Sequence, residues 1–497
     1  MKRKSKLFAA ALSLVMMCAN LSGCKSTVET SGGESSVSSV YTSNTATSTQ
    51  SSSIVSSSSV SSSVRSSSVS TSENVNSSGS SSTTESAPDI TIGSSVSTSE
   101  NVGSSSSSVS SSSFSTPEIF SSSGSSSSSS SEPPQQAQPT QPTPPAQPTE
   151  PVLPDDPIER HIAQMTLRER VYQMFFVTPE QLGGSRPVTT AVNLSERPVG
   201  GILLMGDNLV SVSQTRNMLS QTQENALQSG IGVFLAVDEE GGRVARCALK
   251  LGTTAFDGMA VYGARNNYDE AFNIGQTIGG DLRSLGFNVD FAPVADVDIS
   301  PTNELGNRIF SSDPNVVANM VSGVVRGLNS AGIAATLKHF PGLGAEDGNT
   351  HTDTSIIIDR TLTQLRETEF VPFRSGIGAG ADFVMVGHQK VSSFADDLPA
   401  DLSYTAVTTM LRGELGFNGI AITDAQNMNT ISNVYYSSTA AKLSVKAGID
   451  MILSPVDLDS AANAIIDAVN SGEISEERIN ESVRRILTVK QKMGLLG

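Results

Sequence analysis

The stretch Ile333 to Asp353 reads IAATLKHFPGLGAEDGNTHTD, and the interpretation of the whole chain starts from it. Its first five residues are mostly apolar and predict a buried strand. Lys338 and His339 stand at the carboxyl end of that strand, and Pro341 with three glycines then predicts a loop. The loop carries a second histidine, His351. A buried strand that feeds a glycine-rich loop with titratable side chains is typical of enzymes built from alternating strands and helices.

Eight apolar runs that end in polar or glycine-rich turns predict eight strands. They are Met174–Val177, Gly201–Met205, Gly232–Asp238, Asn288–Val294, Ala334–Phe340, Phe383–His388, Gly419–Asp424 and Met451–Pro455. The first is the weakest, and a helix that begins near Thr166 is its alternative. Helical periodicity fills most of the intervals, in Ser211–Gln228, Asp269–Leu285, Asn315–Ser330, Leu362–Ile377, Tyr404–Leu415, Leu458–Asn470 and Ser475–Met493.

These strands are apolar nearly throughout, as expected when both faces of a parallel sheet are covered by helices. Alternation of eight such strands with helices predicts the α/β class and a closed (β/α)8 barrel of the TIM type. An open doubly wound sheet is the alternative. A dinucleotide-binding sheet would need Gly-x-Gly-x-x-Gly after its first strand, and no such motif opens this domain.

The amino terminus has the pattern of an export signal. Four basic residues precede the apolar run Leu7–Met17, which is too short to span a bilayer. The following Leu21–Cys24 resembles the lipobox of bacterial lipoproteins, in which cleavage leaves a lipidated cysteine. We therefore expect a signal peptide over residues 1–23 and a lipid anchor on Cys24. An ordinary secretory signal is the alternative. After cleavage Cys247 is the only other cysteine, so we expect no intramolecular disulfide.

Residues 24–152 are rich in serine and then in proline, a composition that buries too little apolar surface to fold. We expect a disordered tether there and a catalytic domain over residues 153–497. The tether is either a spacer that carries the domain through a cell wall or a linker without a length requirement. The net charge of −17 disfavours nucleic acid and anionic surfaces as partners, and it is compatible with a neutral sugar.

Polar side chains gather where the predicted strands end. They include Asp238–Arg243, Asp296, Asp298, Asn307–Phe310, Lys338, His339, His388 and Thr423–Met428. Taken singly, each acid could cap a helix and each histidine could be a buried structural residue. Since the carboxyl ends of barrel strands meet on one rim, the set together predicts a polar pocket.

Four motifs in this order resemble glycoside hydrolase family 3. They are DEEGGRVAR at Asp238–Arg246, NRIF at Asn307–Phe310, KHFPGLG at Lys338–Gly344 and TDAQNM at Thr423–Met428. The resemblance covers essentially the whole domain. Within the family it is closest to the single-domain bacterial β-N-acetylglucosaminidases.

The resemblance implies a retaining mechanism, which needs a nucleophile on one face of the anomeric carbon and a proton donor on the other. Asp424 matches the nucleophile. In this branch a loop histidine, paired with an aspartate two residues earlier, is the acid/base, and thirteen positions after Lys338 this histidine is His351. An imidazole titrates near neutrality and can both give and take a proton. The matched sugar-binding positions are Asp238, Arg246, Arg308, Lys338 and His339, and no cofactor or metal is implied.

Two positions depart from the family pattern. Asn349 stands where the paired aspartate is expected, and Leu343 replaces the second histidine of the motif. The amide oxygen of Asn349 can accept a hydrogen bond from the ring of His351, but it cannot stabilise an imidazolium by charge. Asp347 and Asp353 are the candidates for that role.

We therefore expect a lipid-anchored exo-β-N-acetylglucosaminidase, that is, a β-N-acetylhexosaminidase, acting on terminal GlcNAc of cell-wall-derived or other glycans. Its expected location is the extracellular face of the bacterial cell membrane. The expected partners are the carbohydrate and, through Cys24, the membrane, and the expected state is a monomer. A β-glucosidase of the same family and a non-catalytic sugar-binding lipoprotein are the alternatives. Phosphorolysis is less expected than hydrolysis, because little phosphate is available outside a cell.

Overall fold

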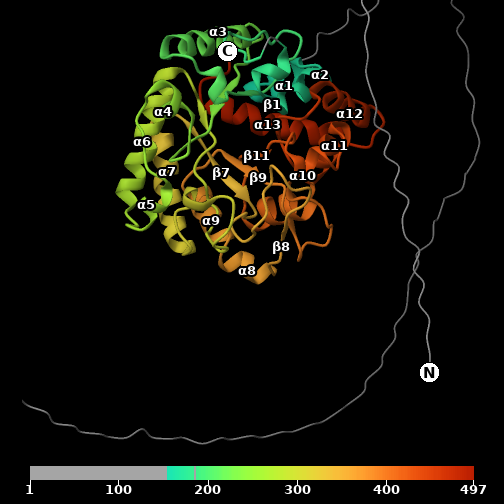
Figure 1. Ribbon diagram of the computed structural model, residues 1–497. Helices are drawn as coiled ribbons and strands as arrows, with labels where there is room; N and C mark the ends of the chain where they lie inside the picture. Colours follow the sequence, from blue (N-terminus) through green and yellow to red (C-terminus); the bar gives the residue numbers. More distant parts are fainter. Residues whose placement is uncertain (1–153, 184–185) are drawn as a thin grey trace, which may run out of the picture. The chain divides into compact units, whose positions relative to one another are not determined.

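The computed structural model describes residues 154–183 and 186–497, and these form a parallel eight-stranded barrel (Figure 1). The strands, in order around it, are β1 (Phe175–Val177), β2 (Gly201–Leu203), β3 (Phe234–Val237), β6 (Val289–Asp290), β7 (Ala334–Phe340), β9 (Phe383–Val386), β11 (Ile420–Thr423) and β12 (Ile452–Leu453). A parallel bridge between Ile422 and Met451 joins β11 to β12 and closes the barrel. All eight predicted strands and the predicted barrel are thus confirmed.

Helices cover the outside of the barrel. The α-helices are α1 (Pro157–Gln164), α2 (Leu167–Gln173), α3 (Val212–Leu227), α4 (Arg246–Leu251), α5 (Met259–Gly263), α6 (Tyr268–Leu285), α7 (Pro314–Ser330), α8 (Leu362–Glu367), α9 (Phe370–Gly378), α10 (Asn429–Ser432), α11 (Ser437–Ala447), α12 (Leu458–Asn470) and α13 (Glu476–Lys492). Short 3-10 turns are η1 (Pro179–Leu182), η2 (Gly206–Asn208), η3 (Gly306–Arg308) and η4 (Ala400–Leu402), and η5 (Thr405–Glu414) is a π-helix. None of the described helices is both long and apolar enough to cross a membrane.

Two small sheets belong to the loops at the carboxyl end of the barrel. The antiparallel pair consists of β4 (Glu239–Gly241) and β5 (Val244–Ala245). The parallel pair consists of β8 (Ile357–Ile358) and β10 (Lys390–Val391). The first pair turns the chain back directly after β3, and the second connects the loop that follows β7 to the loop that follows β9. Both therefore fix loops on the rim where a barrel enzyme carries its site.

Local sequence explains several element boundaries. Thr166 caps the start of α2 through a capping box with Glu169. The helix ends at Gln173, and β1 follows as a separate strand. Ser475 caps α13 as predicted, accepting the backbone N–H of Arg478.

The predicted single helix Leu362–Ile377 is wrong, because the structure divides it into α8 and α9. Pro372 lies in the first turn of α9. It has no N–H to donate and its ring would clash with the carbonyl four residues earlier, so one continuous helix cannot pass through Glu367–Phe370.

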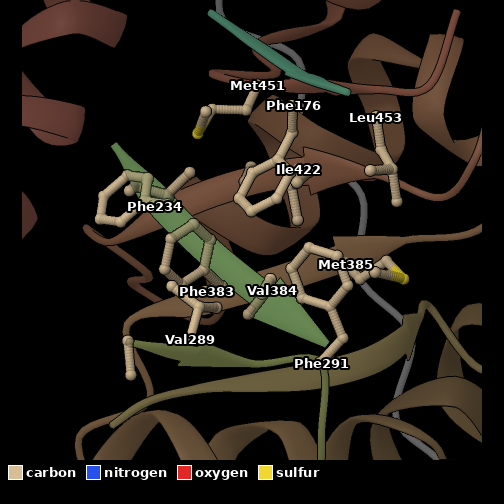
Figure 2. Close-up of a cluster of buried hydrophobic side chains, with 14 of the residues drawn as sticks. Phe176, Phe234, Val289, Phe291, Phe383, Val384, Met385, Ile422, Met451 and Leu453 are labelled. Atoms are coloured by element: carbon tan, nitrogen blue, oxygen red, sulfur yellow. The ribbon is translucent and has the colours of Figure 1, made fainter. Parts of the chain in front are cut away.

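The barrel interior is filled by large apolar side chains from different strands (Figure 2). The ring of Phe176 on β1 lies 5.1 Å from that of Phe291, and the ring of Phe234 on β3 lies 5.2 Å from that of Phe383 on β9, edge to face. All four are fully buried. Offset and edge-to-face aromatic pairs add to the burial of apolar surface. This packing closes the barrel from within and restricts ligands to its rim.

The predicted signal peptide, Cys24 and the tether lie outside the described residues. The predictions for them and for the domain boundaries therefore stay predictions.

Candidate active site

A cavity of about 450 Å³ opens at the carboxyl ends of the strands. Its wall combines side chains from the loops that follow seven of the eight strands with apolar residues of the barrel. The charged and polar members are Thr178, Asp238, Glu240, Arg246, Glu304, Arg308, Lys338, His339, Thr350, His351, Asp424, Asn427, Asn429 and Ser454. The predicted polar pocket thus exists, and it brings together all the predicted sugar-binding residues with Asp424 and His351.

A buried network of opposite charges forms one wall of this cavity. The ammonium of Lys338 lies 2.9 Å from Asp238 and 2.6 Å from Glu240, and Arg308 binds Glu240 through two hydrogen bonds of 2.7 and 2.8 Å. Arg246 lies 3.7 Å from Asp238. Burial alone would raise the pKa of Glu240, but the charges of Lys338 and Arg308 outweigh it and hold the pKa at about 2. The wall is therefore a fixed array of hydrogen-bond donors and acceptors suited to hydroxyl groups.

His339 is held rigidly by Asp296, a residue of the segment that follows β6, which is 1% exposed. One oxygen of this carboxylate accepts the backbone N–H of His339 at 2.9 Å and lies 2.8 Å from its ring Nδ1. The other oxygen accepts the N–H of Leu343 at 2.6 Å. Asp296 thus orders the whole turn after β7 and turns the second ring nitrogen of His339 away from itself. Leu343, in place of a histidine, lines the cavity with an apolar side chain.

Asp424 follows β11 directly and lines the cavity. Burial would raise the pKa of its carboxyl, but the nearby charges of His339, His388 and Lys338 and the N–H of Ala425, 2.7 Å from Oδ1, lower it below its usual range. The carboxylate is therefore ionised at neutral pH, as a nucleophile must be.

A second histidine supports Asp424 from beneath. His388 is fully enclosed, with Nδ1 3.2 Å from Asp401 and Nε2 3.0 Å from the carbonyl of Ala425. Burial would lower the pKa of His388, but Asp401 and Asp424 raise it to about 9. A buried imidazolium thus lies near both carboxylates and contacts the carbonyl of the residue that follows Asp424.

His351 lines the cavity, and its side chain is exposed at the mouth. The expected contact between Asn349 and the ring is not formed, because the amide oxygen of Asn349 accepts the backbone N–H of His351 instead, at 2.9 Å. Asp347 is bonded to Ser300 and Thr302, and Asp353 accepts the N–H of Asn349 at 2.8 Å. Neither of these acids, nor Asn349, is among the described residues that line the cavity.

Two acidic groups of the site were absent from the sequence-based set, whereas Glu240 was in it, within Asp238–Arg243. Asp401 has no sequence signal, since it lies in the short 3-10 turn η4 and meets His388 only through the tertiary fold. Glu304, in the loop after β6, looks like a surface acid and yet lines the cavity.

A closed parallel barrel whose rim holds an ionised carboxylate among histidines, beside a charged wall of hydrogen-bond donors and acceptors, defines an enzyme of the barrel hydrolase class. The sequence identifies which one: residues 166–489 match the family described as "Glycosyl hydrolase family 3 N terminal domain". The chain therefore belongs to glycoside hydrolase family 3, as the motifs predicted.

Relatives agree with this assignment. A protein named Beta-hexosaminidase from Stenotrophomonas maltophilia (strain R551-3) is 34% identical over 311 residues, which are 61% of this chain and 86% of that protein. Beta-hexosaminidase A from Pseudoalteromonas piscicida is 30% identical over 326 residues, and the match spans 60% of this chain and only 54% of that protein.

A solved structure, of a family 3 beta-N-acetylglucosaminidase from Paenibacillus sp. str. FPU-7, is 34% identical with a TM-score of 0.62. The match covers 67% of this chain and 63% of that one.

Proposed function

We propose that the protein is a retaining exo-β-N-acetylglucosaminidase that removes terminal GlcNAc from glycans. The observation that carries the proposal is Asp424, an ionised carboxylate that lines the cavity directly after β11. Unlike Asp238 and Glu240, Asp424 forms no ion pair with a basic side chain among the described residues. The names of the relatives support the choice of sugar.

In the proposed mechanism Asp424 attacks the anomeric carbon while His351 donates its proton to the departing glycosidic oxygen. The bond from the anomeric carbon to that oxygen breaks, and a covalent glycosyl-Asp424 ester forms. His351, now neutral, takes a proton from water as the water attacks the same carbon. The ester bond breaks, Asp424 is released as a carboxylate, and His351 carries its proton again. Two inversions give net retention.

The charged wall positions the sugar for these steps. Asp238 can accept hydrogen bonds from neighbouring hydroxyl groups, and Lys338 and Arg308 can donate to other oxygens of the ring or to the acetamido carbonyl. Because these groups are already held by one another, little reorganisation accompanies binding. The cavity of about 450 Å³ is large enough to hold a sugar ring.

The test is release of the chromophore from an aryl β-N-acetylglucosaminide by the purified full chain, with the matching glucoside alongside. Release from the first substrate supports the proposal, and release from the glucoside alone would move the protein to the β-glucosidases. One relative, from Cellulomonas fimi, bears both activities in its name. Trapping of a glycosyl-Asp424 by a fluorosugar, detected by mass spectrometry, separates an enzyme from a binding protein without turnover.

The product of the reaction shows whether water or phosphate attacks the covalent intermediate. Water gives free GlcNAc, whereas phosphate would give the sugar 1-phosphate. We expect the same free sugar with and without added phosphate, and formation of the 1-phosphate would overturn the hydrolytic part of the proposal.

The proposal includes a lipid anchor on Cys24 and a location on the extracellular face of the cell membrane, supported by the lipobox-like sequence alone. Expression of the full chain in a bacterium fed a labelled fatty acid tests it. We expect label in the membrane-bound protein and none after Cys24→Ala. Unlabelled wild-type protein in the medium would contradict the anchor.

A further inference from the structure

The segment that carries His351 is held to the cavity by bonds to its backbone. The carboxylate of Glu304 accepts both the N–H and the hydroxyl of Thr350, at 3.2 and 2.8 Å. The hydroxyl of Thr430, beyond β11, lies 3.4 Å from the carbonyl of Thr350. Asn349 accepts the N–H of His351. Thr350 is only 3% exposed, so the residue before the proposed acid/base is a buried anchor.

Glu304 is itself on a braced loop. The side-chain oxygen of Asn303 accepts the N–H groups of Leu305 and Gly306, both at 3.0 Å. Arg243 donates to the carbonyls of Glu304 and Leu305. These bonds to the backbone of Glu304 and of the two residues after it fix the point from which its side chain reaches Thr350, so it can hold that residue in one place.

The charge of Glu304 is also distinctive. Of the four carboxylates that line the cavity, Asp238 and Glu240 are neutralised by ion pairs with basic residues. Glu304 and Asp424 have no basic nitrogen within 4.0 Å among the described residues. Glu304 therefore brings an uncompensated negative charge to the side of the cavity that carries His351, where Asn349 brings none.

We propose that Glu304 is the positioning residue for His351. Its carboxylate holds Thr350, and through it the histidine, at the cavity, and its negative charge stabilises the protonated ring in place of the aspartate that Asn349 replaces. The inference rests on the proposed function, since it assigns Glu304 to the acid/base of that reaction.

Other charges also act on the ring. On its own segment these are Glu346, Asp347 and Asp353, and across the cavity they are Asp238, Glu240, Arg246, Arg308, Lys338, His339 and Asp424. Replacing Glu304 removes one negative charge and leaves all of these charges in place, so the effect of Glu304 on the ring is measured as the difference between variant and wild type.

Two substitutions separate position from charge. Glu304→Gln keeps an oxygen that can accept from Thr350 and removes the charge, whereas Glu304→Ala removes both. We expect Glu304→Gln to lower kcat/KM about tenfold on alkyl glycosides, which need protonation of the leaving group, and much less on dinitrophenyl glycosides. We expect Glu304→Ala to lose about 100-fold on the alkyl glycosides, because the histidine is then also misplaced.

Asp347→Asn is the matched control. Asp347 belongs to the same segment as His351 and also accepts hydroxyl hydrogen bonds, from Ser300 and Thr302, but it does not line the cavity. It should keep the wild-type dependence on the leaving group. Thr350→Val, which removes only the hydroxyl bond to Glu304, should fall between wild type and Glu304→Ala.

A measurement without turnover makes the inference independent of the proposed substrate. The full chain has four histidines, so His351→Ala identifies the ring signal of His351 in an NMR titration. In Glu304→Gln the titration midpoint of that signal should move to lower pH, because the imidazolium loses a stabilising charge. In Asp347→Asn it should move less.

These experiments distinguish a failure of the positioning role from a failure of the proposed function. An unchanged midpoint together with wild-type dependence on the leaving group in Glu304→Gln would overturn the positioning role. A shifted midpoint in a protein that cleaves no aryl N-acetylglucosaminide would support the role and refute the proposed function instead. If added azide restores turnover to Glu304→Ala and not to His351→Ala, Glu304 is itself the proton donor and the positioning role is wrong.

Discussion

At the scale of single residues, the roles of Asp424 and His351 can be distinguished by chemistry. His351→Ala should cripple substrates with poor leaving groups, which need a proton, and spare the first step with acidic phenols. Azide attacks the covalent intermediate without help from a base, so it should restore turnover and give a β-glycosyl azide. Kinetics over a leaving-group series with product analysis check this.

Asp424→Ala is the companion variant. It should lose activity on every substrate, by roughly 10⁴-fold or more, since no covalent intermediate can form. Equal losses on good and poor leaving groups in His351→Ala, with no azide adduct, would refute the acid/base assignment.

The buried pair of His388 and Asp401 gives a stability prediction. The folded protein raises the pKa of His388 from 6.5 to about 9, so it binds the ring proton more tightly than the unfolded chain does. The stabilisation is complete below about pH 6.5 and is lost as the pH rises through about 9. Compared with wild type, His388→Gln should therefore be less stable by roughly 3 kcal/mol at pH 6, and the gap should narrow towards pH 9.5.

Denaturant unfolding of both proteins across this pH range measures the gap. His161→Gln is the control for loss of a histidine elsewhere on the barrel. A gap that stays constant from pH 6 to pH 9.5 would show that the His388 charge contributes nothing.

At the scale of elements, the loop after β7 is docked on the loop after β6. Gly344 accepts the N–H groups of Ile299 and Ser300 at 3.0 and 2.8 Å, and a Cβ added to it would lie 2.0 Å from the carbonyl of Val297. Gly344→Ala must therefore push apart the two loops that carry Glu304 and His351. We expect a loss of about 1–3 kcal/mol in stability and a fall in kcat/KM of about 100-fold.

Gly280→Ala in α6 is the matched control, because a Cβ there meets nothing within 4 Å. It should stabilise the protein by about 0.5–1 kcal/mol with unchanged activity. Wild-type kinetics in Gly344→Ala would mean that the docking of the two loops does not matter for the site.

The helices and strands also show how much of the fold could be predicted from the sequence. Strands such as β7 were predictable to the residue, because their runs are apolar on both faces and end at proline and glycine. The break between α8 and α9 was missed although Pro372 signals it, because periodicity continues across it. The orientation of Asn349 towards a backbone N–H was beyond prediction, since amide side chains have several local partners of similar energy.

At the scale of the whole molecule, α13 closes the end of the barrel opposite the cavity. Lys490 on this helix is fully buried, with its ammonium 2.6 Å from Gln173 and 5.1 Å from the ring centre of Phe234. No carboxylate pairs with it among the described residues, and burial lowers its pKa from 10.5 to about 7. The core of the barrel thus holds a basic side chain, and a methionine of similar volume could take its place.

Below about pH 7 the folded protein must carry a desolvated charge at Lys490, which costs stability, whereas the unfolded chain keeps that proton up to about pH 10.5. The contribution of Lys490 to the free energy of unfolding of the wild type therefore becomes more favourable as the pH increases from about 7 to about 10.5.

Lys490→Met should be more stable than wild type by roughly 1–4 kcal/mol at pH 6. Its advantage should shrink towards pH 10, where the lost hydrogen bond to Gln173 remains as a cost. Lys492, two residues further along the same helix, pairs with the largely buried Asp382, so Lys492→Met leaves that carboxylate without its partner and should show no gain at either pH. Equal stability of Lys490→Met and wild type at pH 6 would mean that the buried ammonium is solvated or paired in solution.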